Sequence, residues 1–166
     1  TSDMSEGIAK TYGAEVKEVL TGFKYIGETI DSLTTDEEYV FGMEESYGYL
    51  IGTHARDKDA VSAAMIIVEM TAYYALQGKT LADKLEELYN KYGYYKTALT
   101  SVAFPGMDGK AEMDEIVAKL RENPWQTLCG ENVSAKDYLN GLNGLPKSNV
   151  LAFAGKNIKV TVRPSD

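Results

Sequence analysis

The sequence predicts a protein of the α/β or α+β class, because helical and strand-like segments alternate along it. Apolar residues recur at helical spacing in several segments, and short runs rich in β-branched and aromatic residues lie between them. The length of 166 residues, with 44% hydrophobic and 25% charged residues, suits a compact domain that buries a core.

Helices are expected over the segments in which apolar residues recur at helical spacing, and glycine or a following proline marks where these segments end. The segment 60–77 is apolar around most of its circumference, so we expect it to be a buried central helix. Thr80 and Asp83 predict a capping box at the start of the next helix. The expected helices cover about residues 4–12, 23–33, 60–77, 81–92 and 110–122.

Strands are expected in the segments between and after these helices. The expected strands are residues 15–20, 39–43, 94–104, 150–153 and 158–162, with 133–142 a mixed segment. The last two strands flank Gly155-Lys156-Asn157 and predict a hairpin. An Asn- and Gly-rich stretch precedes them. We therefore predict a domain over residues 1–142, a linker over 143–149 and the start of a second domain over 150–166.

Charge and cysteine content narrow the classes of function. With 17 basic and 25 acidic residues, the net charge of -8 gives no electrostatic reason to bind nucleic acid or an anionic membrane. A local basic spot can still bind a phosphate. The single cysteine, Cys129, excludes an intramolecular disulfide, and we expect it to be a buried thiol in a cytoplasmic protein. No apolar run is long enough to span a bilayer, and no signal peptide is visible.

The segment 44–59 has the highest density of polar and hinge residues. Its carboxylates can accept hydrogen bonds from hydroxyl groups, its glycines allow a ligand to approach closely, and its basic residues can balance a phosphate. The helix that begins near Asp59 directs free N–H groups towards it. These residues alone also fit an ordinary solvated surface loop.

The order of three motifs is more specific. Thr21-Gly22-Phe23-Lys24 is followed by Gly42-Met43-Glu44-Glu45-Ser46-Tyr47-Gly48 and then by His54-Ala55-Arg56-Asp57-Lys58-Asp59. Over residues 1 to about 142 this resembles the third domain of the α-D-phosphohexomutases, in particular the bacterial phosphoglucomutase and phosphomannomutase branch. Val162-Arg163-Pro164-Ser165 resembles the opening of the phosphate-binding loop in the family's fourth domain, although Asp166 departs from the family's Gly-Thr-Glu-Pro continuation.

The resemblance implies a three-layer α/β/α domain with a mixed sheet, plus a truncated C-terminal β-hairpin. It also implies an isomerase of carbohydrate metabolism that interconverts hexose 1-phosphate and hexose 6-phosphate through an enzyme phosphoserine and a bisphosphate intermediate. Glucose, mannose and glucosamine phosphates are the rival substrates, and the Glu-Ser pair favours glucose 1-phosphate and glucose 6-phosphate.

Site residues follow from the same resemblance. Glu44 and Ser46 correspond to positions that hydrogen-bond hexose hydroxyls, and Glu45 is expected to be a structural partner. His54 is either a general acid or base or a loop residue that lines the cleft. The expected substrate-binding residues are Glu44, Ser46, Lys58, Arg56, Lys24 and His54, with Arg163 and Ser165 in an incomplete phosphate loop.

Two family motifs are absent from the sequence: the Ser-His-Asn-Pro loop that carries the phosphate and the Asp-rich loop that holds Mg²⁺. We therefore expect no catalytic or metal-binding residue here, Mg²⁺ bound elsewhere in a longer parent enzyme, and no turnover by this fragment alone. The other domains of the parent are its expected partners. A start without Met and a stop within the phosphate-loop motif favour this interpretation. The alternative is a non-catalytic sugar-phosphate-binding or interaction module of the same fold.

Overall fold

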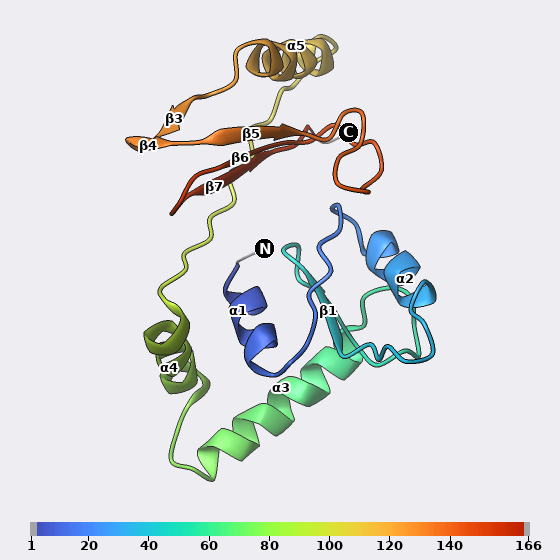
Figure 1. Cartoon of the computed structure of the whole chain (residues 1–166), viewed down its shortest axis with the longest axis vertical. Coiled ribbons are helices and arrows are strands. Elements are labelled where there is room, and N and C mark those ends of the chain that lie inside the picture. Colours follow the sequence, from blue (N-terminus) through green and yellow to red (C-terminus); the bar gives the residue numbers. More distant parts are fainter. Residues whose placement is uncertain (1–2, 165–166) are drawn as a thin grey trace. The chain divides into compact units, whose positions relative to one another are not determined.

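The computed structural model describes residues 3–164. The chain forms two compact units, residues 1–99 and 100–166, and most of their helices and strands are labelled in Figure 1. This division differs from the predicted one. Strand β5 (Ser134–Asp137) pairs antiparallel with β6 (Leu151–Ala154), so the predicted linker over 143–149 is a loop that connects two neighbouring strands of one sheet.

The first unit packs helices around a two-stranded hairpin. Its core contains Phe23, Ile30 and Leu50, and Ile26 and Tyr39 are among the residues that pack against it. Leu50 is fully buried. The elements are α1 (Met4–Thr11), α2 (Phe23–Asp31), β1 (Phe41–Glu44), β2 (Gly48–Ile51), α3 (Ala60–Ala75) and α4 (Leu81–Tyr92).

Local sequence signals set where these helices begin. Asp59 is the N-cap of α3, and its side chain accepts hydrogen bonds from the N–H groups of Val61 and Ser62. The Thr80–Asp83 capping box at the start of α4 is confirmed, since each side chain bonds the other residue's backbone N–H. These caps satisfy N–H groups that have no partner within the helix.

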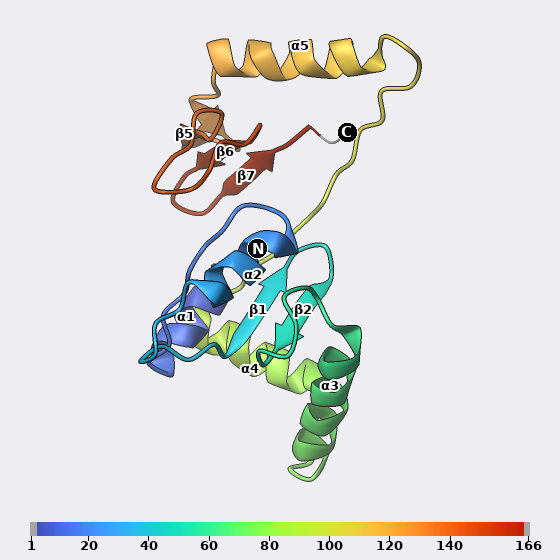
Figure 2. The same cartoon turned by 90° about the vertical axis from the view of Figure 1, so that its right-hand side faces the viewer.

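The second unit packs one helix on a three-stranded antiparallel sheet. Val117 of α5 (Gly109–Glu122) meets Leu151 and Phe153 of β6 in the core, with α5 running across the strands in Figure 2. Arg121 adds an ion pair to Asp137 at 3.1 Å. The sheet order is β5-β6-β7, with β7 at Lys159–Val162, and β3 (Thr127–Leu128) and β4 (Glu131–Asn132) form a separate short hairpin.

The alternating helices and strands confirm the α/β class, but two predicted strands are absent. Residues 15–20 and 94–104 have no strand pairing. All strand pairs in the described part of the chain are antiparallel, so the expected mixed sheet is not seen there. A strand requires a hydrogen-bonding neighbour, and β-branched composition does not supply one.

Two predictions about burial are wrong. Only Ala63 of α3 is buried, whereas Val61, Met65 and Val68 are each more than 65% exposed. Cys129 is exposed as well, in a turn with a positive φ of 50°. Periodicity predicts the side of a helix that seeks apolar contact, but burial also needs a partner surface. No helix of the described residues is long and apolar enough to cross a membrane.

Candidate functional site

The Glu-Glu-Ser-Tyr-Gly motif is the tip of the β1–β2 hairpin. Glu44 pairs with Gly48 in the antiparallel register, and Glu45, Ser46 and Tyr47 form the turn between them. Tyr47 has a φ of 60°, which suits the left-handed position that commonly ends a three-residue hairpin loop. The predicted loop over 44–59 is therefore corrected, since it contains strand β2. The hairpin places Glu44 at a strand end and leaves Ser46 exposed in the turn.

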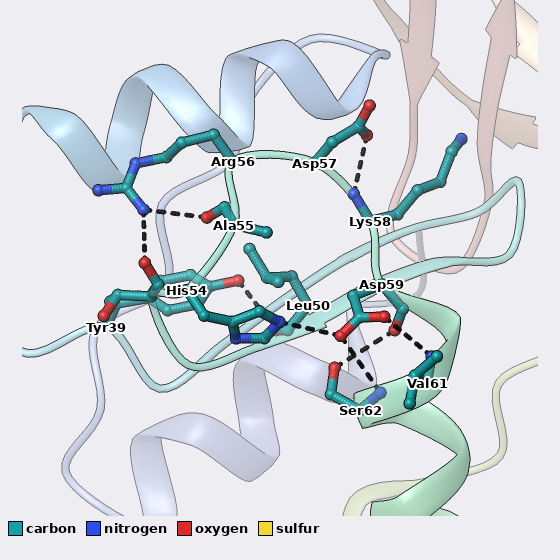
Figure 3. Close-up of polar contacts among 11 residues, drawn as sticks. Tyr39, Leu50, His54, Ala55, Arg56, Asp57, Lys58, Asp59, Val61 and Ser62 are labelled. Carbon is teal, nitrogen blue, oxygen red and sulfur yellow. Dashed lines mark hydrogen bonds and ion pairs between the residues drawn. The ribbon is translucent and has the colours of Figure 1, made fainter.

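The chain after β2 returns to the same hairpin. Gly52 has a φ of 79°, and the N–H of Asp59 donates to the carbonyl of Tyr49 at 2.8 Å. This bond ties the start of α3 to β2. Figure 3 shows the resulting loop, which presents His54, Arg56 and Lys58 within a few residues of one another.

Two of the predicted substrate-binding residues contact each other directly. The ammonium group of Lys58 lies 2.6 Å from Oε1 of Glu44. The Glu44 side chain is 9% exposed and the Lys58 side chain 51% exposed. Hydrogen bonding to Glu44 raises the pKa of Lys58 above its usual value. The structure therefore joins a carboxylate and an ammonium group at the hairpin tip.

His54 contacts the N-cap of α3. Its Nε2 lies 2.9 Å from Oδ2 of Asp59. Hydrogen bonds from His54, and then from Ser62 and the backbone of Val61, lower the pKa of Asp59 to about 2. Figure 3 shows His54 pointing at this carboxylate. The contact favours a structural role for His54 in the loop.

Arg56 holds the loop against α2. Its Nε donates to Oδ1 of Asp31 at 2.6 Å, and its Nη1 donates to the carbonyls of Thr53 and Ala55. A Cβ placed at Gly27 would lie 2.6 Å from the carbonyl oxygen of Arg56, so α2 and the loop are in close contact. In Figure 3 the Arg56 guanidinium and the Lys58 ammonium point in different directions.

Of the remaining predicted residues, Lys24 belongs to the first unit and Arg163 to the second. The Lys24 ammonium sits 4.7 Å from the centre of the neighbouring Tyr25 ring. Arg163 is exposed and follows β7 in the second unit. Ser165 lies outside the described residues.

Sequence reasoning missed several residues that shape the site. Asp31 holds Arg56, and Asp59 joins His54 to α3. Tyr39 donates its hydroxyl to the carbonyl of Leu50 at 3.0 Å. These partners are separated along the chain by 5 to 25 residues, so only the capping role of Asp59 has a local signal.

An open hollow lies on the Arg56 side of the first unit. Its lining is partly acidic, and Glu37 within it is paired with Lys17 at 2.5 Å. No group of three or more His, Cys, Asp or Glu residues among residues 3–164 is arranged to hold a metal ion. The hollow is lined by Ile30, Leu33, Glu37, Glu38, Tyr39, Gly52, Thr53 and Arg56.

Comparisons with known proteins agree with the motif order. The family model for phosphoglucomutase/phosphomannomutase, alpha/beta/alpha domain III, matches residues 1–92. The phosphoglucomutase of Staphylococcus aureus strain USA300 is 36% identical over 178 residues, covering 99% of this chain and 32% of the relative. That of strain N315 is 38% identical over 140 residues, covering 84% of this chain and 25% of the relative.

The chain thus spans about a third of the length of the curated relatives that it matches. No solved structure matches it. The family match ends at residue 92, close to the division between the two units and well before the predicted boundary at 142. The chain belongs to the phosphoglucomutase/phosphomannomutase family, and its first 92 residues match the α/β/α domain III of that family.

Proposed function

We propose that the first unit is the substrate-recognition domain of an enzyme that interconverts hexose 1-phosphate and hexose 6-phosphate. The observation that carries this proposal is the Glu44–Lys58 pair, with 2.6 Å between carboxylate and ammonium, beside exposed Ser46 at the hairpin tip. Glucose phosphates are the proposed substrates, in agreement with the names of the relatives as phosphoglucomutases.

The chemistry of this pair suits a phosphorylated polyol. One oxygen of Glu44 is bonded to Lys58, which leaves the other able to accept a hydrogen bond from a sugar hydroxyl. Lys58 is half exposed and has three donor hydrogens, so it can interact with a phosphate while it keeps its bond to Glu44. A site that reads hydroxyls near the middle of the ring would serve both orientations of the sugar.

The remaining predicted residues receive supporting roles. Arg56, Lys24 and His54 would balance charge or hold the loop around the substrate. Arg163 and Ser165 would belong to a phosphate-binding loop. No step at a metal is assigned to the described residues, among which no group of three or more His, Cys, Asp or Glu is arranged to hold a metal ion.

We assign the chemical step to the rest of the parent enzyme, which would supply the phosphoserine and the magnesium site in the cytoplasm. Phosphoryl transfer depends mainly on positioning and on stabilising charge, and this chain would contribute the positioning of the sugar. Mutase turnover by the purified 166-residue chain would contradict this division of roles.

The proposal is tested by titrating the isotopically labelled chain with glucose 1-phosphate and following its backbone amide shifts. We expect the largest shifts in residues 44–48 and 54–58, with smaller shifts for mannose 1-phosphate. Weak binding is expected, because one domain supplies only part of the substrate site. The sugar-site assignment is wrong if these residues stay silent at high millimolar ligand while another surface responds.

A further inference from the structure

Gly48 has no backbone reason to be glycine. It is a buried strand residue that pairs directly across the hairpin with Glu44. Glycine weakens a strand interior, because it has no side chain to pack and loses more conformational freedom than other residues. Gly48 is not among the glycines with positive φ. A different feature of the hairpin must therefore account for it.

The space beside Gly48 is filled by the side chain of Glu44. A Cβ placed on Gly48 would lie 2.6 Å from both Cγ and Oε1 of Glu44, and 2.9 Å from its Cδ. Real Cβ atoms essentially never approach another heavy atom more closely than 3.0 Å. Any side chain at position 48 would thus move the carboxylate of Glu44.

The far end of the same side chain is held by Lys58. Oε1, one of the atoms that a Cβ at position 48 would strike, is also the oxygen bonded to the Lys58 ammonium group. The absence of a side chain at position 48 and the charge at position 58 therefore constrain one carboxylate from two sides. Together they explain why Glu44 is nearly buried at the end of a short strand.

We propose that Gly48 is a positioning residue, which lets Glu44 fold across the hairpin so that its carboxylate meets Lys58 and presents its second oxygen to a sugar hydroxyl. The sugar contact rests on the function proposed above, whereas the position of Glu44 does not. Gly48 itself makes no contact with the substrate in this account.

The test substitutes Gly48→Ala in the 166-residue chain and compares it with Gly7→Ala. Gly7 lies in α1 of the same unit, its φ is not positive, and an added Cβ would meet Tyr92 at an ordinary 3.5 Å. The first readout is the pKa of the Lys58 ammonium group, measured by NMR. Lys58 faces Glu44 and Asp57, and both acids remain in each variant.

We expect the pKa of Lys58 to fall towards its usual value in Gly48→Ala and to stay raised in Gly7→Ala. An unchanged Lys58 pKa in Gly48→Ala would overturn the proposal. If Gly48→Ala lowers the unfolding midpoint, the double variant Glu44→Ala/Gly48→Ala should recover the midpoint of Glu44→Ala, because the atoms that clash are gone. The proposal would also be overturned if the unfolding midpoint of the double variant fell by the sum of the losses in Glu44→Ala and Gly48→Ala.

The second readout is the affinity for glucose 1-phosphate. Gly48→Ala should weaken binding by about tenfold, as expected for losing a hydrogen bond to a charged group, and should have no further effect in the Glu44→Ala background. An equal loss in both backgrounds would show that Gly48 acts independently of Glu44 and would overturn the proposal. If Lys58 responds to Gly48→Ala but the unsubstituted chain does not bind glucose 1-phosphate, the positioning role stands and the proposed function fails.

Discussion

The β1–β2 hairpin with its following loop and helix α3 are adjacent in sequence but differ in how they are stabilised. In the hairpin and loop, apolar and charged side chains have partners within the chain: Leu50 is fully buried, Glu44 is paired with Lys58, and Arg56 is bonded to Asp31. Helix α3 presents apolar side chains to solvent along its length, and only Ala63 is buried. A helix that is apolar on most sides is normally covered by protein.

The difference indicates that contacts within this chain hold the polar site in place. They do not cover the apolar surface of α3. Relatives of this chain are about three times as long, so much of a relative's chain has no counterpart here. The site can thus be studied in the 166-residue chain, and substitutions in the two regions should have very different effects on its stability.

The largest effect is expected in the core under the hairpin. Leu50→Ala should lower the free energy of unfolding by about 2–5 kcal/mol, because it removes a fully buried side chain and leaves a cavity. Urea denaturation followed by circular dichroism measures this loss. A loss below about 1 kcal/mol would mean that the hairpin is not packed on the core as described.

An intermediate effect is expected from the contact between the two regions, at Asp59. Its pKa is lowered to about 2 by hydrogen bonds from His54, Ser62 and Val61, so its stabilising effect is present above the usual carboxyl pKa of about 4 and is lost as the pH falls towards 2. Asp59→Asn keeps a capping oxygen but does not titrate. The variant should therefore lose less stability than the unsubstituted chain between pH 4 and pH 2, as measured by thermal unfolding.

That difference disappears if Asp59 is not bonded in the folded state. The two proteins would then show parallel stability curves over the same pH range. Glu115→Gln serves as a comparison: Lys119 also lowers the pKa of Glu115, but this pair lies on the exposed surface of α5, so its effect on the loss of stability in acid should be smaller.

The smallest effect is expected in α3. Met65 is 67% exposed, so Met65→Ala should change the free energy of unfolding by no more than about 0.5 kcal/mol. Met65→Lys should also reduce the binding of a hydrophobic dye to the chain, since it interrupts an exposed apolar surface. A loss of about 2 kcal/mol or more in Met65→Ala would show that α3 is covered, and the contrast with the hairpin would fail.

The same contrast explains how much the sequence could predict. The five long helices were located to within a few residues, because capping residues such as Asp59 and Thr80 act over short distances. The burial of α3 and the strand over 94–104 were not predicted correctly. Both depend on a partner surface, which local composition does not specify.

The site was predicted less completely than the helices. The motif order made Glu44, Ser46 and Lys58 candidate site residues, but spacing alone did not show that Lys58 bonds Glu44 across 14 positions. The glycines of the segment 44–59 were expected to allow close approach of a ligand, whereas the structure places the Glu44 side chain in the space beside Gly48. The contacts of Arg56 with Asp31 and of His54 with Asp59 likewise required the folded chain.

The most direct test of the central claim is the affinity of Glu44→Gln for glucose 1-phosphate, measured beside Glu45→Gln. The two substitutions each remove one negative charge from neighbouring positions, and Glu44 is the carboxylate whose Oε1 lies 2.6 Å from the Lys58 ammonium group in the proposed sugar site. We predict that Glu44→Gln weakens binding by about tenfold and that Glu45→Gln changes it by less than about twofold. Equal affinities for the unsubstituted chain and Glu44→Gln would contradict the claim that this hairpin recognises the sugar.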